Sequence, residues 1–336
     1  HYNAGMYKAA RVSLEEAWSK MDSNSDQKET CHFYLVLSKV KLNEKKTDKL
    51  VQEFLNTHPS KTGKNQLFLD IGNHYYDSKE PTKALQWFLQ VSPEFLTTQQ
   101  KEAYHFKMGY TYFIDENYPK AEEYFRSLIT SKKYFNPSHY YLGYIAYVEE
   151  NFEVAQKHFD CLKNVDRYQK ELAYYNVNMQ FKQKKYEQAQ NEGEKLLKQT
   201  SAQEVSEVSK IIGESLFYLK KYSEAIPHLK KYRGKKNQLS TNDHYFLGYA
   251  YYKTKDFKNA ARTFAKIVKG KDLVAQNAYY HLADAYLKLN KKTAALNAFK
   301  NCSELTFDRG IQEDSWYNYA KLSYDIGNPY TSVSEV

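Results

Sequence analysis

The 336-residue sequence predicts an all-α fold, a solenoid built from repeated helix hairpins. A glycine recurs about every 34–37 residues, an alanine follows it after twelve residues, and a large apolar residue follows four residues later. The glycines are Gly72, Gly109, Gly143, Gly213 and Gly248, the alanines Ala84, Ala121, Ala155, Ala225 and Ala260, and the large residues Phe88, Phe125, Phe159, Leu229 and Phe264. Such fixed offsets are typical of arrays in which each unit packs mainly on its neighbours.

Each repeat is predicted to form two helices joined by a turn. When the glycine is numbered position 8, the unit that begins at residue 102 places His105, Met108 and Tyr112 at positions 4, 7 and 11. Spacings of three and four residues put these side chains on one face of a first helix. Position 17 is usually aromatic, as at Tyr118, and it starts an apolar stripe through positions 20, 24 and 27 of a second helix. Polar residues between the two stripes complete a helix hairpin.

On this numbering, residues 1–336 form a single continuous array. Its units begin near residues 28, 65, 102, 136, 170, 206, 241, 276 and 313. Residues 1–27 carry Tyr7, Ala10 and Leu14 at positions 17, 20 and 24, which predicts the second helix of a preceding unit. The last unit is truncated, because it reaches Pro329 before a second helix is complete. We therefore expect the chain to be a piece of a longer array.

The small residues of the repeat indicate a packing need. Glycine inside a helix costs roughly 0.5–1 kcal/mol relative to alanine, so its recurrence at position 8 suggests that the two helices approach closely there. We expect the ring at position 24 to fill the space between one hairpin and the next. The unit that begins at residue 170 departs from the pattern, with Val177 at position 8 and Gly193 at position 24. That departure predicts looser packing in this unit.

Composition narrows the class of protein. Glycine and proline are scarce, at 12 and 7 residues, which argues against disorder and against a turn-rich β fold. No apolar run approaches the ~18–20 residues that span a bilayer, so no transmembrane segment is predicted. The formal charge is +9, and all of the excess lies in residues 169–336. This excess is either a solvated outer edge or an attraction for acidic partners.

The histidines and cysteines do not indicate a catalytic or metal site. Five histidines share two positions of the repeat, namely His105, His139 and His244 at position 4 and His158 and His228 at position 23. Histidines placed by a repeat are predicted to be structural. Cys161 and Cys302 fall at apolar positions and are interpreted as small core residues, and no disulfide framework is expected. With no His-Glu-x-x-His, paired Cys-x-x-Cys or phosphate loop, we expect a non-enzyme without metal, cofactor or small-molecule substrate.

The repeat resembles the tetratricopeptide repeat, whose signature has a large residue at position 4, Leu at 7, Gly or Ala at 8, Tyr at 11, Ala at 20 and Phe at 24. The unit from 276 matches with Tyr279, Leu282, Ala283, Tyr286, Ala295 and Phe299. The unit from 241 matches with His244, Leu247, Gly248, Tyr251, Ala260 and Phe264. The resemblance covers the whole chain and implies a right-handed superhelix whose first helices line a concave groove.

In that family, positions 2, 5, 9, 12 and 13 tend to point into the groove. Here many of them are aromatic, and the resemblance makes them the candidate partner-binding residues: Tyr76, Phe106, Tyr110, Phe113, Tyr140, Tyr144, Tyr147, Tyr174, Phe181, Tyr245, Tyr249, Tyr252 and Tyr280. Tyrosine offers broad contact area with a hydrogen-bonding tip, which suits a groove for a polypeptide segment. The alternative is that the rings stack between successive first helices and tighten the superhelix. Both interpretations stay open at this point.

The favoured function is a non-catalytic protein–protein interaction scaffold, whose protein or peptide partner the sequence does not identify. The chaperone-type carboxylate clamp is not expected, because Lys210 at position 5 is followed by Glu214 at position 9. One alternative is a structural or self-associating module of a larger envelope assembly. A basic nucleic-acid-binding array is less favoured, because the lysines fall mostly at turns, off the aromatic face.

The Tyr-rich units also resemble large multi-repeat proteins of Bacteroidetes-type bacteria. That resemblance is looser than the repeat itself. It implies a periplasmic or envelope-associated location, with a cytoplasmic location as the alternative.

Overall fold

The computed structural model describes residues 1–21, 26–44, 47–57, 61–199 and 205–327. Within these ranges the regular structure is helical, apart from an isolated bridge between Lys235 and Gln238. The prediction of an all-α helical solenoid is thereby confirmed. The chain divides into two compact units, residues 1–164 and 165–336. The continuity of one array over residues 1–336 stays a prediction, and Pro329 lies outside the described residues.

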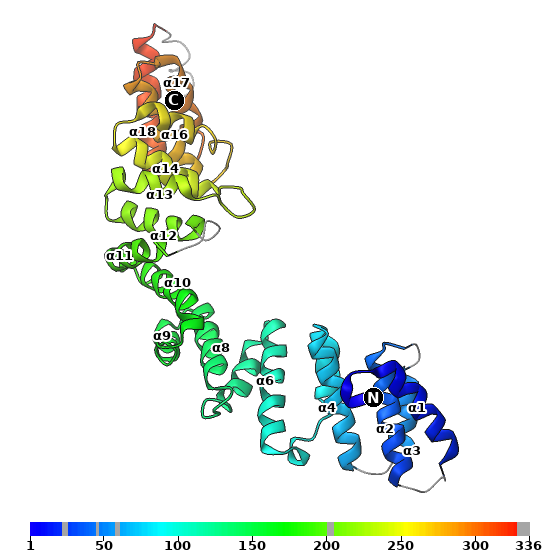
Figure 1. Ribbon diagram of the computed structural model, residues 1–336. Helices are drawn as coiled ribbons and strands as arrows, with labels where there is room; N and C mark the ends of the chain where they lie inside the picture. The colour runs from blue at the N-terminus through cyan, green and yellow to red at the C-terminus, as the bar shows by residue number, and fades with distance from the viewer. Residues whose placement is uncertain (22–25, 45–46, 58–60, 200–204, 328–336) are drawn as a thin grey trace. The chain divides into compact units, whose positions relative to one another are not determined.

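The first unit contains helix hairpins in the predicted register (Figure 1). Its α-helices are α1 (Tyr7–Lys20), α2 (Asp26–Lys41), α3 (Thr47–Thr57), α4 (Lys61–Asp77), α5 (Pro81–Phe88), α6 (Thr98–Ile114), α7 (Tyr118–Arg126), α8 (Phe135–Val148) and α9 (Phe152–Asp160). Short 3₁₀ helices, η1 (Tyr2–Ala4) and η2 (Pro93–Phe95), precede α1 and α6. Helices α4, α6 and α8 each pack on the second helix that follows them, and α1 is the second helix predicted for residues 1–27.

The second unit continues the same alternation. Its helices are α10 (Asp166–Lys182), α11 (Tyr186–Leu197), α12 (Val205–Tyr218), α13 (Tyr222–Lys231), α14 (Thr241–Lys253), α15 (Phe257–Phe264), α16 (Leu273–Lys288), α17 (Lys292–Ser303) and α18 (Arg309–Asp325). Each second helix packs on its own first helix and on the next one, and successive first helices also pack on each other. The first helices of this unit therefore form one layer and the second helices another.

The turn has the same conformation in the seven hairpins from α4–α5 to α16–α17. The residue at position 15 is left-handed, with φ between 57° and 63°, at Lys79, Glu116, Glu150, Lys184, Lys220, Lys255 and Asn290. After α6, the Glu116 amide donates to the Phe113 carbonyl at 3.1 Å, and the Asn117 amide donates to the Tyr112 carbonyl at 2.9 Å. The Asn117 side chain then caps α7 by accepting from the Lys120 amide. This turn reverses the chain so that the second helix begins at position 17.

In the first unit, the glycine at position 8 lies against the ring at position 24 of its own hairpin. A Cβ added to Gly109 would stand 2.9 Å from the Phe125 ring, and one added to Gly143 would stand 2.4 Å from Phe159. Phe125 also stacks on Tyr141 of the next first helix, with ring centroids 4.9 Å apart and planes 13° apart. The prediction that this ring fills the space between hairpins is confirmed, and the glycine makes room for it.

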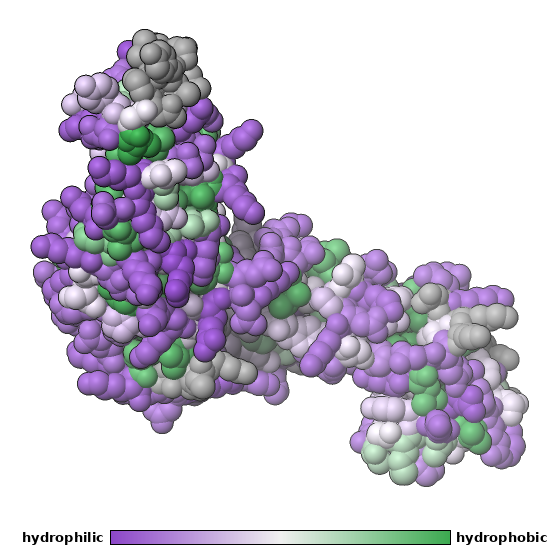
Figure 2. All heavy atoms as spheres, turned by 90° about the horizontal axis from the view of Figure 1, so that it is seen from above, coloured by the Kyte–Doolittle hydropathy of each residue, from purple (hydrophilic) through white to green (hydrophobic). Residues whose placement is uncertain are grey.

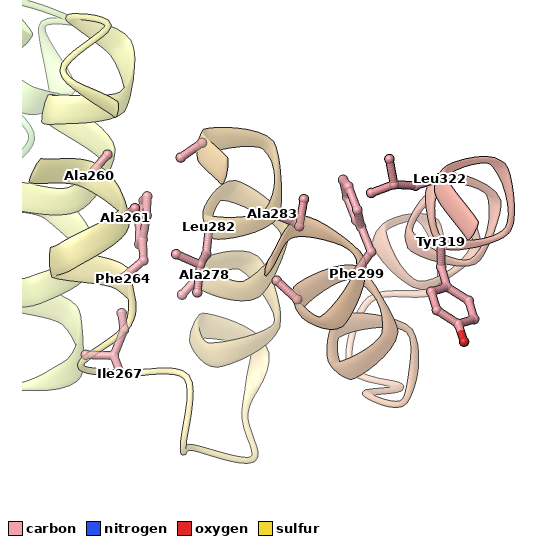
Figure 3. Packing of buried hydrophobic residues seen from close by; sticks show 13 residues of the cluster. Ala260, Ala261, Phe264, Ile267, Ala278, Leu282, Ala283, Phe299, Tyr319 and Leu322 are labelled. Carbon is pink, nitrogen blue, oxygen red and sulfur yellow. The ribbon is translucent and has the colours of Figure 1, made fainter. Parts of the chain in front are cut away.

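In the second unit, α15 to α18 share one buried cluster with the same plan (Figure 3). Phe264 of α15 stacks on His281 of α16, with ring centroids 5.9 Å apart. Phe299 of α17 stands between Ala283 of α16 and Leu322 of α18. Each ring is therefore enclosed by two consecutive repeats, which is how an array with no central core buries apolar surface.

The expectation of looser packing in the unit from residue 170 is wrong. Val177 at position 8 is 2% exposed, and Gly193 at position 24 is buried. A Cβ on Gly193 would stand 2.7 Å from Cγ1 of Ile212, which belongs to the next first helix, and 3.5 Å from Val177. The large and small residues have exchanged helices, and Ile212 occupies the space that a ring takes in the other units.

Cys161 is exposed, so its predicted place in the core is wrong. It is the C-cap residue of α9, and the apolar stripe continues instead through Leu162, which is fully buried. Cys302 is buried in α17, as predicted. Both are free thiols, as is Cys31.

Candidate binding surface

The predicted partner-binding residues all lie on first helices, namely α4, α6 and α8 in the first unit and α10, α14 and α16 in the second. All thirteen are half-buried. In contrast, the rings at position 24 are almost completely enclosed. Tyr317 and Tyr324 of α18, which continue the same face, are 64% and 76% exposed. One face of the first helices thus forms the core, and another carries rings that solvent reaches in part.

Within the first unit, these rings contact one another across neighbouring first helices. The Tyr76 and Tyr110 rings meet edge to face at 5.8 Å, and Tyr110 meets Tyr141 at 5.6 Å. Phe113 of α6 meets Tyr144 of α8 at 5.3 Å. Edge-to-face contacts of this kind are favourable. Stacking between successive first helices is therefore present, and the part of each ring that remains accessible is what a partner can contact.

Helices α6 and α8 present an uncharged surface. Their residues at positions 2, 5, 9, 12 and 13 are Ala103, Phe106, Tyr110, Phe113, Ile114, Pro137, Tyr140, Tyr144, Tyr147 and Val148, which we call the α6–α8 aromatic surface. Ile114 and Val148 are 48% and 41% exposed. The face in Figure 2 is mostly hydrophilic, with hydrophobic residues in small separate groups. A run of ten uncharged positions is unusual for a chain with 26% charged residues.

The second unit pairs its tyrosines with carboxylates. The Tyr252 hydroxyl of α14 donates to Asp284 Oδ2 of α16 at 2.6 Å. One repeat later, the Tyr280 hydroxyl of α16 donates to Asp314 of α18. Burial and this hydrogen bond raise the pKa of Tyr280 to about 12, so the hydroxyl stays a donor at physiological pH. The sequence analysis did not find these partners, although an aspartate stands at position 9 of α16 where α14 has a tyrosine.

Lys210 of α12 is held by carboxylates of its own chain. Its Nζ lies 3.0 Å from Asp243 Oδ1, 3.6 Å from Glu214 Oε1 and 4.6 Å from the centre of the Tyr232 ring. Burial raises the pKa of Glu214 to about 7. Asp243 also closes a capping box with Ser240 at the start of α14. Lys210 is therefore paired with carboxylates of its own chain.

Two of the histidines contact each other inside one hairpin. Nδ1 of His139 in α8 lies 2.9 Å from Nδ1 of His158 in α9. Burial lowers the pKa of both, and that of His158 falls to about 4 because the other imidazole and Arg126 add positive charge nearby. In the described part of the chain, no three His, Cys, Asp or Glu side chains are grouped to hold a metal ion. The two imidazoles contact each other between the two helices of one hairpin.

A pocket lies at the amino-terminal end of the first unit, away from the thirteen aromatic residues. It holds about 300 Å³ and is lined by Tyr2, Leu14 and Tyr34, among others. None of the thirteen aromatic residues lines it. Among the described helices, none is both long and apolar enough to cross a bilayer.

Residues 276–309 match the family model of the tetratricopeptide repeat. No curated protein matches the chain in sequence. Similar solved structures include a tetratricopeptide repeat protein from Parabacteroides merdae, with 11% identity and a TM-score of 0.42 over 93% of this chain and 99% of that chain. The TPR domain of P58(IPK) gives 12% identity and a TM-score of 0.33, over 97% of this chain and 96% of that chain.

A third structure, Naa15/Naa10 bound to HypK-THB, gives 14% identity and a TM-score of 0.47, with coverage of 99% of this chain and 60% of that chain. Repeated hairpins, most of them with small residues at positions 8 and 20, define the chain as an α-solenoid. Residues 276–309 match the tetratricopeptide repeat and the other hairpins share their register, so the chain is similar to proteins of the tetratricopeptide-repeat class. Proteins of this class are in general scaffolds for protein–protein interaction and are typically non-catalytic.

Proposed function

We propose that this chain is a non-catalytic scaffold that binds a polypeptide segment along first helices, through the half-buried aromatic residues that each of its two units carries there. The observation that carries the proposal is the division of each first helix into two faces. The face with positions 4, 7, 8 and 11 builds the core, while the groove-position rings pack on the edge of that core and keep part of their surface accessible. A recurring row of accessible rings is instead typical of a binding surface.

The α6–α8 aromatic surface is the strongest part of this face. Its rings keep each other in place through edge contacts, so that little side-chain freedom is lost when a partner binds. The tyrosine hydroxyls can bond the backbone of an extended or helical segment, while the rings and the exposed Ile114 and Val148 cover its apolar side chains.

The test uses a random-peptide display library panned against the whole chain. Replacement of Tyr110, Tyr144 and Tyr249 together by alanine should abolish peptide selection while the helix content, measured by circular dichroism, is largely kept. A control triple variant replaces Tyr124, Tyr279 and Tyr286, which are half-buried tyrosines outside the groove positions. The control should still select peptides.

Tyr110 and Tyr249 also contact neighbouring rings, so the alanine variant loses some stability as well. A triple phenylalanine variant keeps these ring contacts and removes only the hydroxyl groups. The proposal fails if the alanine variant selects the same peptides as the parent but melts at a far lower temperature, because the rings would then be core residues. Sedimentation over a concentration series separates a monomeric binder from a self-associating module.

We further propose a periplasmic or envelope-associated location. Its support is the likeness of the Tyr-rich units to exported multi-repeat bacterial proteins, and the uncharged α6–α8 aromatic surface suits a partner of a stable assembly. Fractionation of the native cells with an antibody against the chain tests it, and recovery in the cytoplasmic fraction would contradict it.

A further inference from the structure

The first helices of the second unit carry a group of tyrosines and carboxylates with a chemistry that differs from the α6–α8 aromatic surface. The group consists of Tyr252, Tyr280, Asp284 and Asp314, and we call it the tyrosine–carboxylate ladder. Its members come from α14, α16 and α18, which pack side by side. Asp284 also raises the pKa of Tyr280 through its charge. The Tyr252–Asp284 pair therefore lies close enough to the Tyr280–Asp314 pair to influence it.

The first unit shows how a tyrosine ring and a carboxylate together hold a lysine. Nζ of Lys107 in α6 lies 4.9 Å from the centre of the Tyr76 ring in α4. The same atom lies 2.8 Å from Asn73 Oδ1 and 3.6 Å from Asp77 Oδ1. A cation over a ring face with a carboxylate beside it gains from both contacts. Lys210, described above, has the same kind of surroundings in the second unit.

At the tyrosine–carboxylate ladder the ring and the carboxylate are present, but the lysine is not supplied by the chain. Neither Asp284 nor Asp314 forms an ion pair with another residue in the described ranges. The nearby Lys253 lies over the Tyr249 ring instead, 5.1 Å from its centre. Two carboxylates are thus left without a cation on a face that solvent reaches, since Asp314 is exposed and Asp284 is half-buried.

The two carboxylates of the ladder are negative, whereas residues 169–336 as a whole carry an excess of positive charge. Residues 169–336 hold the whole basic excess of the chain, yet the ladder has two carboxylates and no cation among its four members. The adjoining Tyr317 is 64% exposed and adds a free ring beside Asp314. Electrostatic complementarity chiefly sets which partner binds and in which register. A basic side chain of a partner would meet two carboxylates at this site.

We infer that the tyrosine–carboxylate ladder binds a lysine or arginine side chain of a partner polypeptide segment. The inference rests on the proposed function and adds the chemistry of the partner to it. The carboxylates give the basic side chain its ion pair, and the tyrosine rings cover its aliphatic stem. The tyrosine hydroxyls, which donate to the same carboxylates, keep those groups fixed before binding.

The experiment compares two panels of peptides selected from the same random-peptide display library. One is selected on the parent chain and the other on the double variant Asp284→Asn, Asp314→Asn. Asparagine keeps the size of the side chain and an oxygen that can accept from tyrosine, so that the fold is retained. The control variant Glu187→Gln, Glu224→Gln removes the same charge from exposed positions on second helices.

The parent and the control are expected to select peptides enriched in lysine or arginine relative to the unselected library, and the double asparagine variant should lose that enrichment. A selected basic peptide, synthesised and titrated, should bind the asparagine variant about tenfold more weakly, as expected when a charge-assisted contact is lost. Raising the salt concentration should weaken its binding to the parent more than its binding to the variant.

The outcomes separate this inference from the proposed function. If the parent selects peptides without a basic enrichment, or if the asparagine variant selects the same basic peptides, the inference is wrong and the polypeptide-binding function stands. If the parent selects no peptides, the proposed function is wrong and the inference falls with it.

Discussion

Gly143 of α8 lies directly against the Phe159 ring of α9, so closely that a Cβ on the glycine would stand 2.4 Å from the ring. The ring is 2% exposed and has little space into which it can move. The separation of the two helices in this hairpin is therefore set by the absence of one methyl group.

The variant Gly143→Ala is expected to lower the free energy of unfolding by about 1 kcal/mol. Overpacking typically costs about 1–3 kcal/mol, which exceeds the roughly 1 kcal/mol that alanine gains over glycine in a helix. Urea denaturation measures the difference. Adding Phe159→Leu should recover part of the loss, because the smaller side chain leaves room for the methyl group.

Gly310→Ala is the matched control. Gly310 lies exposed in the first turn of α18, where an added Cβ meets only a carboxylate oxygen of Asp308, at 3.3 Å. This variant should be as stable as the parent or more stable. A Gly143→Ala variant that is equally stable would show that Phe159 can shift freely.

The left-handed residue in the hairpin turn offers a stabilising substitution. Glu116 has φ 57°, a conformation that costs an ordinary residue roughly 1 kcal/mol or more and costs glycine nothing. Glu116→Gly should therefore raise the melting temperature, with a gain of about 0.5–1 kcal/mol after the greater flexibility of glycine in the unfolded chain is subtracted. Glu123→Gly, at an exposed helical position of α7, should do the opposite. A lower melting temperature for Glu116→Gly would mean that its side chain stabilises the turn.

The histidine pair predicts loss of stability in mild acid. Burial lowers the pKa of His158 from 6.5 to about 4, so the folded chain favours the neutral imidazole. The stability that this provides is complete above pH 6.5 and is lost as the pH falls toward 4, because the unfolded chain takes up the proton first. His158→Gln cannot take up this proton, so melting curves recorded across that window should show a weaker pH dependence in the variant. Identical pH dependence would contradict the assignment.

The raised pKa of Glu214 predicts that stability changes with pH in the opposite direction to the effect of His158. Its pKa is raised from 4.5 to about 7, so the folded chain favours the protonated carboxyl. That contribution is full below pH 4.5 and is lost as the pH rises through 7. Glu214→Gln should therefore be more stable than the parent at pH values above 7, by about 1 kcal/mol. Lys210 keeps its contact with Asp243 in this variant. Glu224→Gln, at an exposed position of α13, is the control, and a variant no more stable than the parent in alkali would refute the prediction.

The hairpins could be predicted from the sequence because the positions that set them are local. Spacings of three and four residues mark the first helices, and the residue at position 17, such as Tyr118 or Phe257, begins the second helix in the structure as well. The glycine at position 8 signalled close packing because its cost inside a helix has no local compensation.

What could not be predicted depends on contacts between units. Ile212 fills the space beside Gly193. Ile212 belongs to the next repeat, so the pattern of the unit from 170 alone does not predict this contact. The exposure of the groove-position rings depends on residues at position 6 of the following unit, such as Tyr141 and His281. Asp314 accepts the Tyr280 hydroxyl only because two repeats align in register. The thirteen rings lie on first helices and are half-buried, and their role in binding stays a prediction.

The enclosure of Phe264 by His281 has a consequence for cutting the chain. The ring belongs to α15, while the residue that covers it belongs to α16. Without the other, each side of the connecting loop would expose apolar surface that is buried in the whole chain. Cleavage near Gly270 would leave one fragment with a bare ring and another with the imidazole and Leu282 that cover it. Two such halves are complementary, and we expect them to reassociate when mixed. The complementary surfaces of neighbouring repeats thus help to fix the order in which the repeats pack, in addition to their covalent connection.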